Sequence, residues 1–156
     1  MKGPVLFSNP EFNCLANNSA FQVEYRGIRF QTAEHAYQYS RFYNDNWEFG
    51  KTDKVGALLL NSVSVNVAMS IAFVHQDSTL PGMKGYTNQA YRTMLSILKC
   101  KSEQHSDVRN ILPKTRPRLL INDIPHLIKD DDEIWGQGEY GNGKNMLGQV
   151  WMDIRV

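Results

Sequence analysis

The sequence predicts an α+β fold: a single, mostly helical domain over residues 1–156 with a small β-hairpin or sheet. Three observations support this. Two short segments on either side of a glycine alternate apolar and polar residues, and several longer segments have helical periodicity. No linker, repeat or low-complexity stretch divides the chain, and its 156 residues are enough for one domain with a real core.

The predicted hairpin is formed by residues 21–25 and 28–30, which alternate apolar and polar side chains. Gly27 lies between these segments and is suited to the turn. Residues 5–19, which precede the hairpin, are rich in Asn and Ser and are expected to be irregular.

A helix is predicted over residues 32–42, because Thr32 is a good N-cap and no glycine or proline follows within ten residues. Glu34, Gln38 and Arg41 are spaced i, i+4 and i+7, so they share one face. Two interpretations remain open. The row either lines a cleft for a polar ligand or forms an ordinary solvated helix surface.

The later part of the chain is expected to be mainly helical. Pro113 is expected to end the short helix predicted over residues 104–112. The expected elements are, in order, a loop at 44–50, one or two helices over 51–74, a break at 76–85, a helix over 86–101, a short helix over 104–112, a candidate strand at 119–121, an acidic loop at 122–133, a glycine-rich loop at 136–148 and a last short helix ending at Val156.

Composition favours a cytoplasmic protein. The net charge is +1, from 17 basic and 16 acidic side chains, which gives no reason to expect a nucleic-acid stripe or a membrane-seeking face. Residues 55–74 are apolar but are interrupted by polar side chains, and the N-terminus has no signal-peptide core. Cys14 and Cys100 form neither a disulfide framework nor a metal motif, so reduced thiols are expected.

Residues 130–145 contain two nucleotide-binding patterns by coincidence. Residues 136–141 match the dinucleotide pattern, but no strand precedes them and no acidic residue follows at the required distance. Residues 138–145 match a phosphate-binding loop, except that Asn145 replaces the hydroxyl residue that binds magnesium. The glycine amides with Lys144 can still bind an anion. The alternative is a surface turn that caps the last helix.

Trp135, the carboxylates and the histidines are further candidates for a functional site. Trp135 either stacks on a base or sugar ring or belongs to the core. Glu34 and a carboxylate within residues 130–133 could together cleave a glycosidic bond, because such cleavage uses one carboxyl group as an acid or base and another to stabilise the positive charge. No metal site is expected, because the histidines lack ligand spacing and are interpreted as structural. They are His35, His75, His105 and His126.

Several short motifs occur in a specific order along most of the chain. They are Leu15-Ala16-Asn17, the turn residue Gly27, Glu34-His35-x-x-Gln38, Asp132-x-x-Trp135-Gly136-x-Gly138, Gly143-Lys144-Asn145-x-Leu147-Gly148 and Met152-x-x-Arg155. Together they resemble the YbiA-type N-glycosidase family, which lies within the NADAR superfamily named for NAD and ADP-ribose chemistry. The resemblance implies a YbiA-like fold.

The resemblance also implies hydrolysis of a C–N bond between ribose and a base or amine, with no cofactor. One branch of the family acts on phosphorylated riboflavin-pathway intermediates, and another removes ADP-ribose from bases, guanine in particular. Glu34 would be the catalytic carboxylate and Asp132 the second polar group near the ribose. The implied substrate-binding residues are Asn17, Gln38, Arg41, Tyr86, Lys101, Trp135, Gly138, Gly143, Lys144 and Asn145.

Two positions depart from the family pattern. Arg41 stands where the family usually has a lysine, and Tyr86 stands where it usually has a tryptophan. Some members are thought to trap the ribose on a lysine amine, which a guanidinium cannot do. The reaction would then use direct attack by water, or the amine of Lys101 or Lys144 would trap the ribose instead.

The function expected from the sequence is therefore an N-glycoside hydrolase acting on a phosphorylated ribosyl substrate, either a riboflavin-pathway intermediate or an ADP-ribosylated base. Its partner would be a nucleotide-like molecule, including ADP-ribosylated or modified nucleic acid, and no membrane. Two alternatives remain open: a non-catalytic ADP-ribose or nucleotide-binding module, and a DNA glycosylase acting on a modified base.

Overall fold

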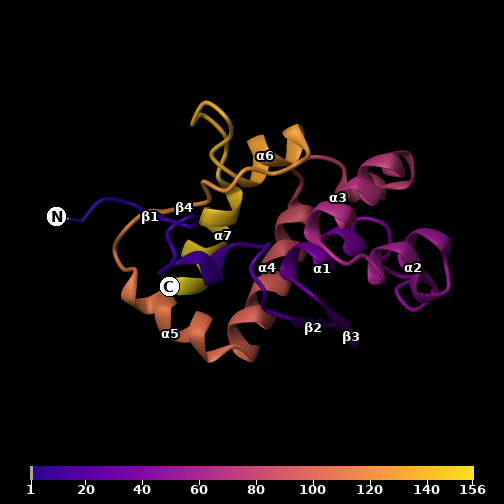
Figure 1. The fold of residues 1–156 in the computed structure, drawn as a ribbon, viewed down its shortest axis with the longest axis horizontal. Helices are drawn as coiled ribbons and strands as arrows, with labels where there is room; N and C mark the ends of the chain where they lie inside the picture. Colours follow the sequence, from indigo (N-terminus) through magenta and orange to yellow (C-terminus); the bar gives the residue numbers. More distant parts are fainter. Residues whose placement is uncertain (1) are drawn as a thin grey trace.

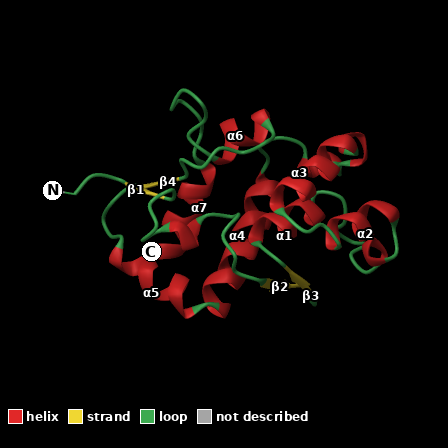
Figure 2. Cartoon of the chain, in the orientation of Figure 1, coloured by secondary structure: helices red, strands yellow, loops and turns green. Residues whose placement is uncertain are grey.

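The computed structural model of the protein describes residues 2–156 and has the predicted, mostly helical α+β fold (Figure 1). Within these residues lie seven α-helices and two two-stranded sheets. Helices α1 (Ala33–Ser40) and α4 (Asn88–Gln104) lie near the centre, as Figure 2 shows. The strands β2 (Val23–Tyr25) and β3 (Ile28–Phe30) lie on one side of them, and α6 (Lys129–Trp135) lies on the other.

The hairpin is confirmed. Strands β2 and β3 pair antiparallel, with Val23 opposite Phe30, and both of these side chains are buried. The turn between the strands needs a left-handed backbone, and Gly27 supplies it with a φ of +82°. The hairpin leads directly into α1, so it fixes where that helix begins.

Helix α1 begins where the sequence predicts, because the Thr32 side chain accepts the His35 backbone N–H at 3.2 Å. All eight residues of α1 are buried. The solvated-surface interpretation of the Glu34 row is therefore wrong. The physical reason is that α1 packs against α4, β2 and β3, and also against α2 (Lys54–Leu60) and α3 (Val65–Val74), so no face remains for solvent.

Helices α2 and α3 confirm the expectation of one or two helices over 51–74. Ser64 separates them and caps α3 by accepting the Val67 N–H at 3.2 Å. Two 3₁₀ turns occupy the expected break at 76–85. Within residues 2–156, no helix combines the length and apolar character needed to cross a membrane.

Helix α4 carries much of the core. Thr87 caps it by accepting the Ala90 N–H at 3.0 Å. The sequence predicts an apolar stripe of Ala90, Met94, Leu95 and Leu98 on this helix; Leu95 is half-buried and the other three are buried. Its principal partner is α7 (Met146–Arg155), which buries Trp151 completely.

The helix predicted over 104–112 is α5 (Ser106–Lys114), and Pro113 does not end it. A proline removes its own N–H and crowds the carbonyl four residues earlier, but it leaves later residues free to close the last turn. Here the Thr115 N–H reaches the Leu112 carbonyl at 3.2 Å. The expected helix end was therefore two residues too early.

Two expectations for irregular structure were wrong. Residues 5–19 contain β1 (Val5–Leu6), which pairs parallel with β4 (Leu120–Ile121), the predicted candidate strand. A two-residue strand has no detectable alternation, and its partner lies far along the chain. Residues 122–133 include most of α6, where an acidic loop was expected. Acidic residues suit the first turn of a helix, and the burial of Asp131 and Trp135, four residues apart, gives α6 an inward face.

Candidate active site

Glu34 and Gln38 lie one turn apart on α1 and form the centre of the site. Glu34 is 5% exposed and Gln38 is fully buried. Gln38 Nε2 donates a hydrogen bond to Oε2 of Glu34 at 2.6 Å. Oε1 of Glu34 makes no hydrogen bond within residues 2–156, but it is not fully enclosed by protein atoms. Oε1 is therefore the oxygen that is open to the adjoining cavity.

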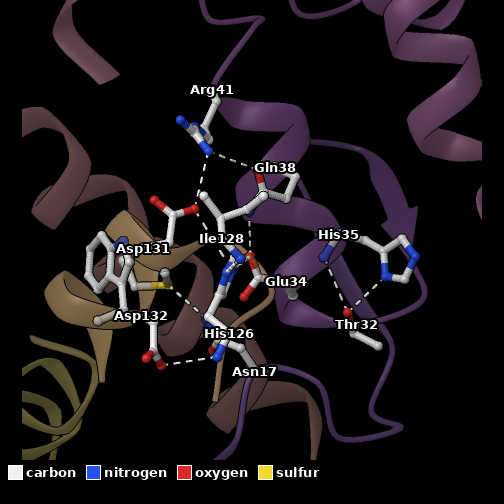
Figure 3. Close-up of polar contacts among 12 residues, drawn as sticks. Asn17, Thr32, Glu34, His35, Gln38, Arg41, His126, Ile128, Asp131 and Asp132 are labelled. Carbon is white, nitrogen blue, oxygen red and sulfur yellow. Dashed lines mark hydrogen bonds and ion pairs between the residues drawn. The ribbon is translucent and has the colours of Figure 1, made fainter. Parts of the chain in front are cut away.

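His126 reaches Glu34 from the loop between β4 and α6, as Figure 3 shows. Its Nε2 lies 3.5 Å from Glu34 Oε2 and 3.8 Å from Asp131 Oδ2. The expectation that every histidine is structural missed this residue. No motif or metal-ligand spacing marks it, and its partner lies 92 residues earlier in the chain.

Asp131 and Asp132 on α6 complete the polar cluster (Figure 3). Asp131 is buried, and its Oδ2 lies 3.3 Å from Nη1 of Arg41. Oδ1 of Asp132 accepts the backbone N–H of His126 at 3.0 Å. The sequence indicated Asp132 as the second carboxylate. The structure brings Asp131 to the same place, where the sequence could not distinguish it from its acidic neighbours.

The two carboxylates in contact with His126 have pKa values displaced in opposite directions. Burial by itself would raise the pKa of Glu34, but the neighbouring His126 and other donors hold it below its ordinary 4.5. Burial raises the pKa of Asp131 above 3.8 and outweighs the lowering effect of Arg41. Burial would lower the pKa of His126, but Glu34 and Asp131 raise it above 6.5. Opposite displacement of this kind is typical of acid–base sites.

These side chains line a cleft next to α1. The inner cavity has a volume of about 30 Å³ and is lined by Glu34, His126, Asp131, Asp132, Asn17 and Trp135, among others. That volume is enough for a water molecule but not for a sugar. An outer cavity of about 510 Å³ lies beside it, and His126 and Asp132 line both. A third cavity, of about 270 Å³, is lined by Asp131 and Arg41.

Asn17 and Trp135 both line the inner cavity. Asn17 is 7% exposed, and its Oδ1 is buried without a hydrogen-bond partner within residues 2–156. Buried acceptors are normally satisfied, so this atom is suited to a ligand donor such as a hydroxyl. Trp135 is buried and packs edge-on against Tyr37, with ring centroids 5.2 Å apart. It therefore belongs both to the core and to the cleft wall.

The glycine-rich loop is organised by its own backbone. The N–H groups of Gly143, Lys144 and Asn145 donate to the carbonyls of Gln137, Glu133 and Gly136, at 2.7 to 2.9 Å. These three amides are not free to hold an anion. Of these three residues, Lys144 still has an exposed side chain that could contact an anion.

Gly138 and Asn145 have different surroundings within this loop. Gly138 lines the outer cavity and has a φ of +75°, which favours glycine. The Asn145 side chain accepts the Asn122 N–H at 2.8 Å and donates to the Leu120 carbonyl at 2.9 Å. Asn145 therefore joins the loop to β4, and this contact is structural.

Six of the predicted substrate-binding residues line none of the three cavities: Gln38, Tyr86, Lys101, Gly143, Lys144 and Asn145. Tyr86 is 46% exposed and precedes α4. Lys101 is completely buried, and its Nζ donates to the Ala16 carbonyl at 2.9 Å and to Ser19 Oγ at 3.0 Å. Burial lowers the pKa of Lys101 to about 7. Its amine does not face the cleft, and neither does Lys144.

Among residues 2–156, no group of three or more His, Cys, Asp or Glu residues is arranged to hold a metal ion. Cys14 and Cys100 are both free thiols. The site therefore offers carboxylate oxygens, an amide oxygen and an imidazole N–H, a set that suits hydroxyl groups and developing positive charge.

The chain was compared with known proteins. N-glycosidase YbiA of Escherichia coli (strain K12) is 25% identical over 148 residues, which cover 95% of this chain and 82% of that protein. N-glycosidase Npun_R5314 of Nostoc punctiforme is 25% identical over 144 residues, covering 92% and 84%. An NMR structure of E. coli YbiA superposes with a TM-score of 0.68 at 23% identity, covering 99% of this chain and 85% of that one. This structural likeness shows the shared fold.

The family comparison covers almost the whole chain. The NADAR domain family matches residues 5–156, a range that includes α1, the His126 loop and the glycine-rich loop. The protein therefore belongs to the NADAR domain family.

Proposed function

We propose that the protein is an N-glycosidase that hydrolyses the C–N bond between ribose and a base in a phosphorylated ribosyl substrate. The names of its relatives from E. coli and N. punctiforme support this reaction class. The proposal rests mainly on the different surroundings of the two carboxylate oxygens of Glu34. One oxygen of this buried carboxylate is held by donors, and the other is open to a cavity of the size of a water molecule.

The two cavities suggest how the reactants would be placed. The inner cavity suits the attacking water, because it adjoins Glu34 and has room for little else. The outer cavity suits the substrate, because its volume of about 510 Å³ falls within the range of small-molecule sites. Asp132 lines both cavities and is thus positioned beside the reacting bond.

In the proposed reaction, the water oxygen bonds to C1 of the ribose and one water proton passes to Glu34 Oε1. The C1–N bond breaks, its electron pair stays on the nitrogen, and the nitrogen takes a proton from solvent. Positive charge develops at C1 in the transition state, as in other glycoside hydrolyses. The carboxylates of Glu34 and Asp132 stabilise that charge.

Direct attack by water is favoured over a covalent lysine intermediate. Arg41 remains a guanidinium at ordinary pH and cannot form a Schiff base. The fully buried amine of Lys101 is held by Ala16 and Ser19, and no lysine lines the inner cavity within the described chain. Lys129 lines the outer cavity, but its side chain is 78% exposed and its Nζ lies 4.0 Å from Glu133 Oε1.

The substrate class has two candidates, which follow from the resemblance. One is a phosphorylated riboflavin-pathway intermediate, and the other is an ADP-ribosylated base such as guanine. A Zea mays relative named riboflavin biosynthesis protein PYRR, chloroplastic, is 34% identical over 62 residues, but these cover only 40% of this chain and 9% of that protein. This match supports the first candidate weakly.

The test is a chromatographic assay of base release by wild type and by Glu34→Gln. The panel contains a riboflavin-pathway ribosylamine phosphate, ADP-ribosylated guanine in DNA and RNA, NAD, and DNA with modified bases. Release from one member by wild type alone would establish the activity and its substrate. If no member reacts but ADP-ribose raises the melting temperature, the protein is a binding module, which is consistent with Arg41 at the lysine position.

A further inference from the structure

His126 is held in one position by three separate contacts. Its backbone N–H donates to Asp132 Oδ1 at 3.0 Å, and its ring Nδ1 accepts the Ile128 N–H at 3.0 Å. Its Nε2 lies 3.5 Å from Glu34 Oε2. Figure 3 shows the ring between α6 and the Glu34 carboxylate. A loop residue anchored in this way is pre-organised for a defined contact with Glu34.

The contact with Ile128 determines which nitrogen carries the proton in the neutral ring. Because Nδ1 accepts a backbone N–H, the hydrogen of the neutral imidazole is on Nε2. A protonated ring also carries a hydrogen on Nε2, but its Nδ1 then carries a hydrogen as well and no longer accepts the Ile128 N–H. In both states, therefore, an N–H points from His126 towards Oε2 of Glu34.

We propose that His126 is a positioning residue for Glu34. With Gln38, it holds Oε2 so that Oε1 is left as the oxygen that accepts the proton of the attacking water. The catalytic role of Oε1 rests on the proposed function. The hydrogen-bonding role of His126 towards Glu34 does not, and it can be measured without turnover.

The charges around His126 decide how such a role is tested. Glu34 faces the ring from α1, while Asp131 and Asp132 face it from α6. Arg41 lies next to Asp131 and completes the cluster. If His126 only positions Glu34, a side chain that donates a hydrogen bond but does not titrate should preserve turnover in its place. If His126 transfers protons, the same substitution should abolish turnover.

The variants His126→Ala and His126→Gln separate these two roles. Alanine removes the ring N–H, whereas the glutamine amide can donate near the place of Nε2 but cannot exchange a proton at neutral pH. His75→Ala is the control, because His75 lies at the end of α3, away from the cleft.

The first measurement is a carbon NMR titration of the Glu34 carboxyl in protein labelled with ¹³C-glutamate, with the signal assigned by Glu34→Gln. His126→Ala should raise the pKa of Glu34, because burial is then opposed by fewer donors. His126→Gln should return it most of the way to the wild-type value. An unchanged pKa in His126→Ala would overturn the proposal, whatever the protein's activity.

The second measurement uses the substrate identified by the base-release panel. His126→Ala should lower kcat about 10- to 100-fold with little change in KM, and it should move the acidic limb of the pH profile upward. His126→Gln should recover most of kcat. If glutamine restores the pKa of Glu34 but not kcat, His126 transfers protons and the positioning role is wrong.

A measurement on wild type covers the case in which the alanine variant fails to fold. Nitrogen NMR at pH 9 reports the tautomer of each neutral histidine. His126 should carry its hydrogen on Nε2. A hydrogen on Nδ1 would overturn the proposal, because Nε2 would then have no donor to offer Glu34. If the panel shows no turnover, only the proposed function fails, while the two NMR results still decide the role of His126.

Discussion

The side-chain amide of Gln38 is oriented by contacts at both of its ends. Its nitrogen donates to Glu34 Oε2 at 2.6 Å, and its oxygen accepts from Nη1 of Arg41 at 3.2 Å. The same Nη1 lies 3.3 Å from Asp131 Oδ2. Two carboxylates on different helices are thus linked through Gln38 and Arg41. This network makes the position of Glu34 specific, while Nε of Arg41 lies buried without a hydrogen-bond partner within residues 2–156.

Glu34→Gln should abolish turnover and leave the fold intact. The amide keeps the volume of the side chain but cannot accept a proton, and loss of a general base typically costs 10²–10⁴-fold. Base release measured by chromatography, together with circular dichroism and a thermal melt, would check this. Glu48→Gln is the control, because the Glu48 side chain is 74% exposed. Activity close to wild type in Glu34→Gln would remove Glu34 from the mechanism.

Asp132→Asn tests the carboxylate charge separately from its hydrogen bond. The Asn Oδ1 can still accept the His126 N–H, so the loop should stay in place. We expect kcat to fall about 10- to 100-fold, because the charge that stabilises C1 is lost. Unfolding in urea should show little change. Asp107→Asn, on the exposed side of α5, is the control, and equal kcat values in the two variants would contradict the role of Asp132.

No covalent adduct should form between the protein and the ribose. A Schiff base would require a lysine amine at C1, and the inner cavity contains none within residues 2–156. At the outer cavity, the Lys129 side chain is 78% exposed and extends towards Glu133. Wild type incubated with substrate and borohydride should keep its intact mass in mass spectrometry. A mass increase equal to the reduced ribosyl group, mapped to Lys129, Lys101 or Lys144, would contradict direct attack by water.

Lys101 should make the free energy of unfolding depend on pH. The pKa of Lys101 is lowered to about 7 in the folded protein, whereas its ordinary value is 10.5. Between these values the unfolded chain binds a proton that the folded chain does not, so stability rises with pH, by up to about 1.4 kcal/mol per pH unit. Below about pH 7 Lys101 is protonated in both the folded and the unfolded chain, so its effect on the free energy of unfolding no longer changes with pH.

Lys101→Met should remove that dependence. Urea unfolding of wild type and variant at pH 6, 8 and 9 should give a stability difference that is constant near pH 6 and grows in favour of wild type above pH 7. Lys99→Met, an exposed lysine on the same helix, should behave like wild type. Parallel pH curves for wild type and Lys101→Met would show that the buried amine remains protonated.

Local residue patterns were sufficient to predict several elements. Thr32 caps α1, Gly27 turns the hairpin, and the spacing of Glu34, Gln38 and Arg41 places them in one row. These features depend on backbone geometry and on neighbours within one or two helical turns. A chain segment carries that information by itself.

Tertiary structure decided the features that depend on distant partners. It determined that the Glu34 row is buried, that β1 pairs with β4, and that the acidic residues of α6 form a helix with Asp131 facing inward. It also brought His126 to Glu34 across 92 residues. Burial and long-range pairing are properties of the packed chain, because the desolvation that displaces the pKa of Glu34 and the donors that oppose it come from different elements.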